Sequence, residues 1–379
     1  MKKCKLGDIL QFHRGYDLPI DEMEHGEYPV VGSSGINGYH NRYTTEAPSV
    51  SVGRSGNSAG KAFIYYGRTW THNTALFVER FMNCNPVYAY YLLKSINLSD
   101  YATGSAVPTL NRNHIHDIEI QIPDTIAEQK KIANILKMID DKIEINEKTI
   151  DNLESMAKTL YDYWFVQFDF PDDNGHPYKT SGGKMEWNET LSREIPAGWE
   201  VSSIGCITEN FDSQRIPLSA QERQAIKGEI PYYGATDVMD YVNRPIFKGQ
   251  YVLIAEDGSV MDANGFPFVQ MIYGNSWVNN HAHVLRGKNG YSNERLYLLL
   301  KEIPVVSIKT GSIQAKINQN NLNSYNIVIP KRDIATLFDN KIIPVFDKIR
   351  ELKEENRKLT SLREFLLPML MNGQVTFHQ

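Results

Sequence analysis

The feature that most constrains this chain is an internal repeat. Short motifs of the first half recur in the same order in the second half, most of them 207 positions later. A repeat this long predicts two duplicated domains rather than a solenoid. Two similar domains in one chain are naturally related by a pseudo-two-fold axis, which suits a two-part target such as duplex DNA. The recurring pairs are Tyr28–Ser33 with Ile230–Ala235, Trp70–Ala75 with Trp277–Ala282, Thr103–Ser105 with Thr310–Ser312, and Pro123 with Pro330.

Length and composition fit two ordinary domains. The 379 residues, 41% of them hydrophobic, can bury two cores. No apolar run approaches the roughly 18 residues of a membrane span, and the N-terminal lysines lead into no signal segment. We therefore expect a cytoplasmic protein without membrane contact. Cys4, Cys84 and Cys206 are odd in number and scattered, which predicts free thiols rather than disulfides or a zinc site.

The overall charge argues weakly against nucleic-acid binding. The formal net charge is -5, whereas neutralising phosphates supplies the sequence-independent part of DNA affinity. A DNA reader needs only a local basic surface, however, and net charge averages over the whole molecule.

Each half combines a β-rich segment with a long helix, so the predicted fold class is α+β. Short β-prone runs such as Tyr28–Val31, Ser49–Val52, Ala62–Tyr66 and Ala75–Val78 alternate with Gly, Asn and Pro. Single helices are predicted from Pro86 to Leu93 and over Asn293–Lys301. The predicted segments are a first β-rich domain (1–124), a central helix (125–170), a connector with a second domain (171–332), and a C-terminal helix (333–379).

The two long helices carry apolar stripes that can pack on each other. Apolar residues return every three or four positions, which predicts that the helices pair as an antiparallel coiled coil. Pro344 should kink or restart the second helix, and Pro368 should loosen its last turns. The predicted seam comprises Ile132, Leu136, Ile139, Ile143, Ile150, Leu153 and Leu160 in the first helix, and Ile349, Leu352, Leu359, Leu362 and Leu366 in the second.

Asn146 and Asn356 interrupt these stripes. A buried asparagine in a seam costs stability but restricts the register. The alternative is that each asparagine faces solvent at an imperfect stretch of the stripe. The sequence favours neither interpretation.

Gly53–Lys61 resembles a phosphate-binding loop but lacks its spacing. A P-loop needs four residues between its glycines and a Ser or Thr after the lysine, and Ala62 follows Lys61 here. We interpret the segment as a glycine-rich hairpin that carries Arg54, Asn57 and Lys61. Arginine suits guanine edges and lysine suits phosphates, although solvated charges on an ordinary turn are the alternative. The second-half counterpart, Glu256–Ser259, keeps the glycine and replaces the arginine by an acid, as two readers of different sequences would require.

Other motifs give no support for catalysis. Asn85–Tyr88 resembles the base-binding loop of adenine methyltransferases, but no glycine-rich donor-binding turn accompanies it, so proline at a helix start explains it. His114 with His116, and His281 with His283, lack clustered carboxylates or thiolates and are interpreted as polar strand edges rather than metal ligands. No nucleophile elbow is present. The sequence therefore predicts no metal site and no catalytic residue.

Taken together, the motifs resemble the DNA-specificity subunit of type I restriction–modification systems. The resemblance spans nearly the whole chain, and the order of the motifs is more specific than any one of them. They are Leu6–Ile9, Gly53–Gly56, Trp70–Ala75, Thr103–Ser105, Ile120–Pro123, Glu128–Ile132, Tyr163–Phe165, Ile195–Trp199 and Leu366–Val375.

The resemblance implies a non-catalytic subunit. In that family each repeat is a target-recognition domain followed by a long helix, and each domain reads half of a split, asymmetric DNA site. The helical pair sets the gap between the halves. Two methyltransferase subunits bind the helical pair, and two restriction–translocase subunits join in the full enzyme. S-adenosylmethionine, ATP and magnesium are expected only on those partners. One departure is that Asp333–Ala335 replaces the Glu128–Lys130 type of helix entry, which puts the start of the second helix in doubt.

Two other functions stay open at this point: the recognition region of a fused adenine methyltransferase, and an assembly scaffold that reads no bases. The bases read and the gap length are not encoded in any recognisable motif. Under the favoured interpretation the DNA-facing residues are polar loop residues of both domains. They are Ser34, Asn37, Tyr39, Arg54, Asn57, Lys61, Ser105 and Arg112 in the first domain, and Thr236, Asp237, Glu256, Asp257, Ser259, Ser312 and Lys316 in the second.

Overall fold

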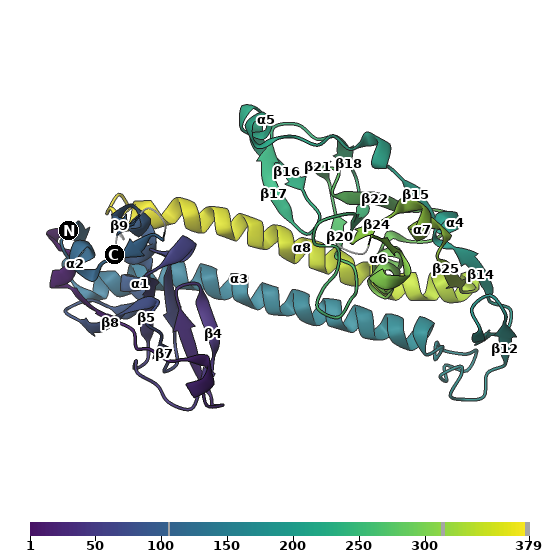
Figure 1. Ribbon diagram of the computed structural model, residues 1–379, viewed down its shortest axis with the longest axis horizontal. Helices are drawn as coiled ribbons and strands as arrows, with labels where there is room; N and C mark the ends of the chain where they lie inside the picture. Colours follow the sequence, from purple (N-terminus) through teal and green to yellow (C-terminus); the bar gives the residue numbers. More distant parts are fainter. Residues whose placement is uncertain (105–106, 312–314, 376–379) are drawn as a thin grey trace. The chain divides into compact units, whose positions relative to one another are not determined.

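The computed structural model describes residues 1–104, 107–311 and 315–375. They form two compact units, Met1–Asn146 with Glu354–Gln379 (unit 1) and Glu147–Lys353 (unit 2). Both units mix strands and helices (Figure 1). The two long helices each contribute one segment to each unit, so the units do not coincide with the four predicted segments, and those boundaries remain a prediction.

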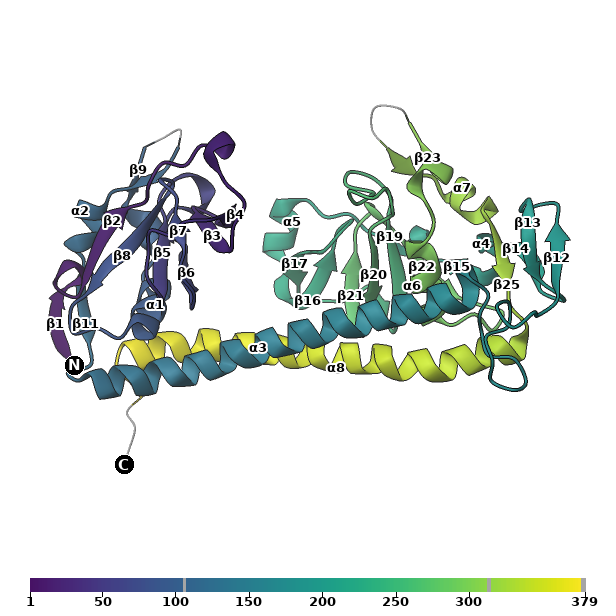
Figure 2. The ribbon, with the colours of Figure 1, turned by 90° about the horizontal axis from the view of Figure 1, so that it is seen from below.

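Unit 1 is built on a four-stranded antiparallel sheet with the order β2-β8-β5-β6 (Figure 2). A second sheet, β4-β3-β7, contains a parallel pair in which Val30 lies opposite Trp70. Two further antiparallel pairs, β1-β11 and β9-β10, complete the unit. The strands are β1 Lys2–Lys5, β2 Leu10–Arg14, β3 Tyr28–Gly32, β4 Gly35–His40, β5 Ser49–Gly53, β6 Ala62–Tyr65, β7 Trp70–Thr71, β8 Ala75–Phe81, β9 Ala102–Thr103, β10 Thr109–Leu110 and β11 Glu119–Ile122.

Helix α1, Pro86–Ser95, covers the β5–β6 side of this sheet. Pro86 begins the helix, and the Asn85 side chain caps it by accepting a hydrogen bond from the Tyr88 amide at 3.0 Å. Leu93 of the helix is fully buried with Val50 of the sheet. The structural interpretation of the Asn-Pro-Val-Tyr segment is therefore confirmed. The short helices are η1 Leu6–Asp8, η2 Ile20–Glu22, η3 Gly56–Ser58, η4 Leu98–Tyr101 and α2 Arg112–His116.

Unit 2 contains a four-stranded antiparallel sheet, β15-β22-β19-β20, and a sheet β17-β16-β21-β18 with one parallel pair. The predicted helix over Asn293–Lys301 is confirmed as α6, and it packs on the first sheet. Short pairs β14-β25, β12-β13 and β23-β24 accompany them. The strands are β12 Met185–Asn188, β13 Arg193–Pro196, β14 Glu200–Ser203, β15 Thr208–Asn210, β16 Lys227–Tyr233, β17 Val238–Val242, β18 Phe247–Lys248, β19 Tyr251–Ala255, β20 Val269–Ile272, β21 Asn275–Val278, β22 Ala282–Gly287, β23 Lys309–Thr310, β24 Lys316–Ile317 and β25 Asn326–Ile329. The shorter helices are η5 Asp162–Val166, α4 Ile204–Ile207, η6 Asp212–Gln214, α5 Ala220–Ala225, η7 Val305–Ser307 and α7 Gln319–Ser324.

The long helices are α3, Ile126–Tyr161, and α8, Arg332–Met371. Helix α8 continues through Pro344 and Pro368, so the predicted restart is wrong. Proline removes one backbone hydrogen bond from a helix, and burial of Phe338, Ile342, Phe346 and Ile349 on both sides of Pro344 holds the helix together despite that loss. Among the described residues, no helix has both the length and the apolar character needed to cross a membrane.

In each unit a segment of α3 lies beside a segment of α8 (Figures 1 and 2). In unit 1, Asp140 pairs with Arg363 at 2.6 Å and Asn146 contacts Asn356, so the two segments run in opposite directions. In unit 2, Glu154 pairs with Lys353 at 3.1 Å. The predicted seam residues Ile132, Leu136, Ile139, Ile150, Ile349 and Leu352 are buried, and Ile143, Leu153, Leu160, Leu359 and Leu366 are half-buried.

Leu362 was wrongly placed in the seam, because its side chain is 45% exposed. Asn146, by contrast, is only 1% exposed. Its amide nitrogen donates to the side-chain oxygens of Asn356 and Glu355, each at 2.8 Å, and its oxygen accepts from Lys142 Nζ at 2.9 Å. The structure thus decides in favour of the interpretation that Asn146 is a buried polar position of the helix pair.

The asparagine pair gives a stability prediction. Asn146→Ala should lower the free energy of unfolding by about 1–3 kcal/mol, because the side-chain oxygen of Asn356 loses the hydrogen bond that it accepts from Asn146. The double variant with Asn356→Ala should cost less than the sum of the single variants, by about 0.5–3 kcal/mol. Urea unfolding of all four proteins measures this coupling. Leu362→Ala, at an exposed position of the same helix, serves as the control and should change stability by less than about 0.5 kcal/mol. Strict additivity would contradict the proposed pairing.

Candidate nucleic-acid interface

Arg54 sits where three segments of unit 1 meet. Its backbone amide donates to the Thr74 carbonyl at 2.9 Å, and its carbonyl accepts from the Leu110 amide at 2.7 Å. These bonds fix the backbone directly after β5, between the β8 side of the sheet and the β9–β10 hairpin. The guanidinium is partly exposed and donates to the Asn73 carbonyl at 3.3 Å.

The Arg54 side chain lines an open cavity of about 550 Å³ on the surface of unit 1. Arg14 and Asp17 line the same cavity and form a loose, exposed ion pair at 3.6 Å. Three arginines against one aspartate make the lining locally basic, despite the negative charge of the whole chain. The lining residues are His13, Arg14, Gly15, Tyr16, Asp17, Arg54, Leu76, Thr103, Thr109, Leu110, Asn111 and Arg112.

The glycine-rich segment forms the β5–β6 hairpin, as predicted. Asn57 and Lys61 are exposed on it. Gly60 adopts φ +90°, and a Cβ there would lie 2.6 Å from the Ser99 amide nitrogen, so both the turn and the close approach require glycine. The hairpin therefore presents Asn57 and Lys61 on the exposed surface.

The remaining candidates of unit 1 lie on exposed surface. Ser34 is in the β3–β4 turn, and Asn37 and Tyr39 are on β4, where the Tyr39 side chain is 54% exposed. Arg112 begins α2 and reaches the cavity described above. Ser105 lies outside the described residues.

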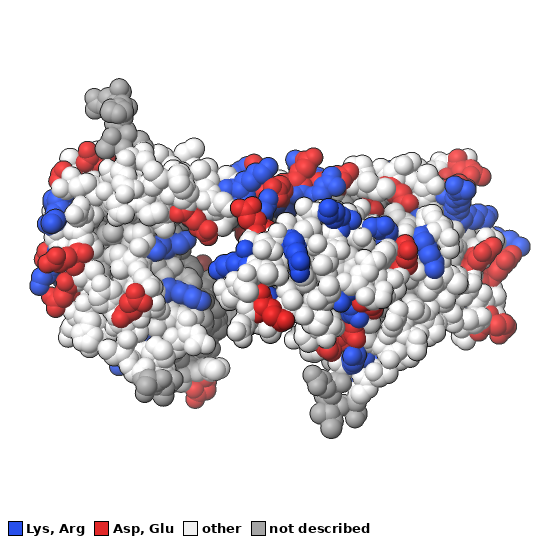
Figure 3. Space-filling view, turned by 90° about the horizontal axis from the view of Figure 1, so that it is seen from above, with Lys and Arg blue, Asp and Glu red and all other residues white. Residues whose placement is uncertain are grey.

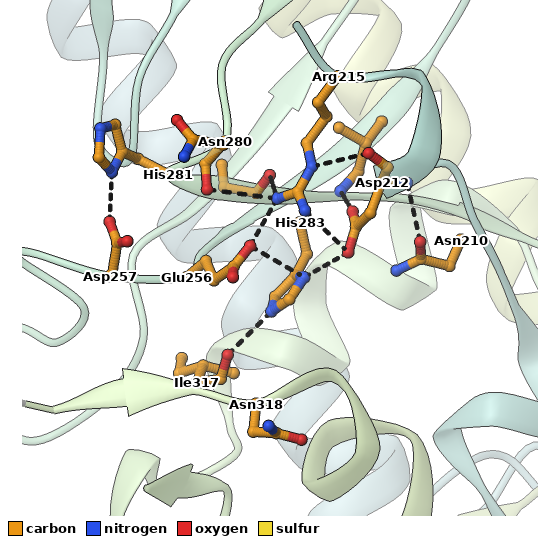
Figure 4. A network of polar contacts seen from close by, with 12 residues as sticks. Asn210, Asp212, Arg215, Glu256, Asp257, Asn280, His281, His283, Ile317 and Asn318 are labelled. Atoms are coloured by element: carbon orange, nitrogen blue, oxygen red, sulfur yellow. Dashed lines mark hydrogen bonds and ion pairs between the residues drawn. The ribbon is translucent and has the colours of Figure 1, made fainter. Parts of the chain in front are cut away.

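Glu256 takes the same backbone position in unit 2 that Arg54 takes in unit 1. Its amide donates to the His281 carbonyl and its carbonyl accepts from the Ile317 amide, both at 2.8 Å. The carboxylate is not free: it pairs with Arg215 at 2.6 Å (Figure 4) and with Lys316 at 3.0 Å.

Asp212, on η6, belongs to the same network. It contacts Arg215 at 3.5 Å and His283 at 2.6 Å, and its other oxygen accepts from the Val284 amide at 2.8 Å. Arg215 also donates to the Ala282 carbonyl at 2.7 Å. All these side chains are largely buried, with the exception of Lys316.

The network corrects the sequence analysis of the histidines. His283 is buried on β22 and does have clustered carboxylates, since Asp212 and Glu256 lie beside it. His114 and His116 lie on helix α2 rather than on a strand edge. Asp212 is 71 residues from His283 in the chain, so the local spacing around the histidine gave no sign of it.

Asp212, Glu256 and His283 have the donor types of a metal site, and their ligand atoms lie within 4.8 Å of one another. The oxygens, however, already face cations of the chain itself, Arg215 and Lys316. A metal ion would have to displace both of them. We interpret the cluster as an ion-pair network, and the absence of a metal remains a prediction.

Burial and pairing set the protonation of this network. Burial by itself raises the pKa of the Asp212 carboxyl, but hydrogen bonds from His283 and the Val284 amide lower it overall. Burial also raises the pKa of Glu256, and hydrogen bonds from Arg215 and Lys316 reverse that effect. Both acids are therefore charged in the folded protein at neutral pH.

The two units carry exchanged charges at matching positions. In unit 1, Arg14 lies opposite Leu76 and pairs with Asp17, three residues later. In unit 2, the Asp212 carboxylate accepts a hydrogen bond from the Val284 amide, next to His283. Asp212 pairs with Arg215, also three residues later. The sequence analysis missed these four charged residues. The echo of Leu6–Ile9 in Ile204–Ile207, 198 positions later, could have aligned them.

The other candidates of unit 2 are mostly exposed turn residues. Thr236 and Asp237 lie in the β16–β17 turn, and Ser259 lies in the segment after β19. Asp257 contacts the ring of His281. Ser312 lies outside the described residues.

Among the described residues, charged side chains of both signs alternate on the face of each unit that Figure 3 shows, without a continuous basic band on either unit. Any DNA contact on this face must therefore rely on local groups of cations. Two local groups of cations are found among the described residues: the arginines that line the cavity of unit 1, and Arg215 with Lys316 in the network of unit 2.

Comparison with known proteins identifies a family. The model of the type I restriction modification DNA specificity domain matches residues 1–155 and 196–361. The MjaIX specificity subunit of Methanocaldococcus jannaschii is 28% identical over 316 residues, covering 76% of this chain and 68% of that protein. The HindI specificity subunit of Haemophilus influenzae is 22% identical over 359 residues, covering 76% and 77%.

A second Haemophilus influenzae protein, a putative type I restriction enzyme specificity subunit, is 32% identical over 173 residues, which is 45% of this chain and 43% of that protein. Among solved structures, a type I restriction-modification S subunit from M. genitalium superposes with a TM-score of 0.64 at 18% identity, covering 98% of this chain and 96% of that one. At this identity the likeness concerns the fold.

The Asp212–Arg215 pair of unit 2 is largely buried, whereas the Arg14–Asp17 pair of unit 1 is exposed, and this difference yields a prediction. Arg215→Ala should destabilise unit 2 by up to about 3–5 kcal/mol, because Asp212 and Glu256 stay largely buried while each loses a guanidinium partner and keeps only His283 or Lys316 beside it. The matched variant Arg14→Ala removes an exposed partner of Asp17 and should cost at most about 1 kcal/mol. Hydrogen–deuterium exchange of β22 and β8 peptides measures the two local effects. Equal protection changes in both units would refute the contrast.

Proposed function

This chain belongs to the family of type I restriction modification DNA specificity domains, and we propose that it is the sequence-specific DNA-recognition subunit of a type I restriction–modification complex. It reads a bipartite, asymmetric DNA site and carries no catalytic centre of its own. Unit 1 reads the first half-site and unit 2 the second.

The fold proposed for this role has two repeats. Each repeat is a β-rich target-recognition domain followed by a long helix, and α3 and α8 pack as an antiparallel coiled coil. The opposite directions of the α3 and α8 segments in unit 1, the Glu154–Lys353 pair between the two helices in unit 2, and the buried Asn146 support this arrangement. In this role the helices fix the length of the unread gap between the half-sites.

The observation that carries the proposal is the exchange of charge at one backbone position. Arg54 and Glu256 make the same two backbone hydrogen bonds, yet their side chains differ in sign. Two domains that read different base sequences need a constant frame with variable side chains, because each base pair offers its own pattern of donors and acceptors. Neither a structural scaffold nor a duplicated enzyme requires such an exchange.

In unit 1, Arg54 donates to acceptors on a base edge, and guanine is its best partner. Arg14 and Arg112 line the cavity, and Lys61 is exposed on the β5–β6 hairpin. In this proposal all three contact phosphates and orient the duplex. Further contacts with the first half-site come, in this proposal, from the polar residues Ser34, Asn37, Tyr39, Asn57 and Ser105.

In unit 2, Lys316 is the exposed cation of the network and makes the DNA contact, while Glu256 holds it in place. Thr236, Asp237, Asp257, Ser259 and Ser312 are the further candidates. An acidic residue can accept a hydrogen bond from the cytosine amino group, which gives this domain a different preference from unit 1.

The proposed partners are double-stranded DNA, two methyltransferase subunits and, in the complete enzyme, two restriction–translocase subunits. S-adenosylmethionine, ATP and magnesium bind those subunits. Base flipping and methyl transfer to adenine take place there, outside this chain. The proposed location is the cytoplasm, where the DNA and the partner subunits are found.

Arg54→Ala in a complex with the methyltransferase subunits should relax recognition of the first half-site and leave the second intact. Loss of one bidentate contact costs about 1–3 kcal/mol of discrimination, or roughly 5- to 150-fold. Methylation mapping of a random-sequence DNA library measures both halves in one experiment. Arg80→Ala, an exposed arginine on β8 outside the cavity, is the control and should leave the motif unchanged. Equal relaxation of both half-sites would contradict the division of labour.

Donor binding separates this function from a fused methyltransferase. The isolated chain should show no S-adenosylmethionine binding by isothermal titration calorimetry, and the complex with methyltransferase subunits should bind it. The physical reason is that Asn85–Tyr88 serves as a helix start, with Asn85 occupied by the Tyr88 amide. Saturable binding to the isolated chain would favour the fused-enzyme alternative.

A further inference from the structure

The ring of His283 lies between two hydrogen-bond acceptors. Its side chain is only about 2% exposed. Nδ1 lies 2.6 Å from Asp212 Oδ2, and Nε2 lies 2.9 Å from the carbonyl oxygen of Ile317 (Figure 4). A carboxylate and a peptide carbonyl can only accept. Both contacts are therefore satisfied only when the ring carries a hydrogen on each nitrogen, as an imidazolium.

Charged groups of three elements face this ring. Asp212 and Arg215 come from η6 and its C-terminal end, Glu256 follows β19 at 3.6 Å from Nδ1, and Lys316 lies on β24. Two acids and two bases cancel, so the proton on His283 gives the group a net positive charge. Burial alone lowers the pKa of His283, but the hydrogen bond to Asp212 and its charge raise the pKa overall.

The ring also fixes the strand that carries Lys316. The Ile317 amide donates to the Glu256 carbonyl at 2.8 Å, and the Ile317 carbonyl accepts from His283. Both backbone groups of Ile317 are thus tied to the network. In unit 1, the Leu110 amide donates the matching hydrogen bond to the Arg54 carbonyl. The strand position that corresponds to His283 is occupied by Leu76, whose alkyl side chain cannot form a hydrogen bond.

We propose that the doubly protonated ring of His283 is a positioning residue for the second half-site, holding β24 and Lys316 where they meet DNA, so that recognition of this half-site alone weakens in alkaline solution. This inference rests on the proposed function of the chain. It predicts a difference between the half-sites because unit 1 has no titrating group at the matching position Leu76.

The direction of the effect follows from the pKa shifts. Because the pKa of His283 is raised in the folded protein, its contribution is fully present below the ordinary imidazole value and is lost as the pH rises through the raised value. The pKa values of Asp212 and Glu256 are lowered, so these acids stay charged throughout that range.

The first test uses the full chain bound to its methyltransferase subunits. Competition binding compares the cognate duplex with duplexes altered in one half-site, from about pH 6 to about pH 9.5, which spans the range above the ordinary imidazole pKa. Selectivity for the second half-site should fall about tenfold over this range, whereas selectivity for the first should stay constant. A second-half selectivity that does not change with pH overturns the proposal.

Two variants sharpen this test. His283→Leu copies the residue of unit 1 and should give low second-half selectivity at every pH, with no pH dependence. His281→Gln removes the neighbouring, half-exposed histidine and should keep the wild-type profile. Full second-half selectivity in His283→Leu, or loss of the pH profile in His281→Gln, overturns the assignment to His283.

A second measurement is independent of DNA and of any variant. In the wild-type chain labelled with ¹⁵N-histidine, the His283 ring is identified by its nuclear Overhauser contacts with Ile317, and both nitrogens should be protonated at about pH 7, above the ordinary imidazole pKa. A neutral ring overturns the positioning role alone. Absence of selectivity for either half-site in the wild type overturns the proposed function as well.

Discussion

Two backbone hydrogen bonds hold the position at which we propose that each unit presents a side chain to DNA. In each unit the residue directly after a central strand donates to one neighbouring segment and accepts from the short hairpin on its other side. These bonds involve Arg54 with Thr74 and Leu110, and Glu256 with His281 and Ile317. Because main-chain groups make them, the side chain at this position can change without disturbing the frame. The fold therefore fixes where a side chain is presented and leaves its chemistry free.

The two units use that freedom in opposite ways. Around Arg54 the charges are exposed and loosely paired, so they remain available to a polyanion. Around Glu256 the charges are mostly buried and closely paired, and one exposed cation, Lys316, remains at the edge. A chain with a net charge of -5 can still contact DNA under these conditions, because the cavity lining of unit 1 is locally basic and Lys316 is exposed at the edge of the unit 2 network.

Local patterns in the sequence predicted local structure well. The proline-led helix at Pro86, the glycine-rich hairpin with Gly60 and the long amphipathic helices all rest on neighbours within a few residues. Predictions failed where distant residues decide. Packing of Phe338 and Phe346 carries α8 through Pro344, and Asp212 meets His283 only after folding. The repeat could have revealed the exchanged charges of the Arg14–Asp17 and Asp212–Arg215 pairs. Insertions, however, change the repeat spacing from 198 to 207 residues between segments, so aligning the two halves at one fixed spacing does not match these pairs.

Cross-linking tests most directly whether each unit reads its own half of the DNA site. A photo-reactive amino acid is placed at position 54 or at position 316 of the full chain, in the complex with its methyltransferase subunits and a cognate duplex. Position 54 should cross-link to bases of one half-site only, and position 316 to bases of the other half-site only. Cross-links from both positions to the same half-site, or to the gap between the half-sites, would contradict the account.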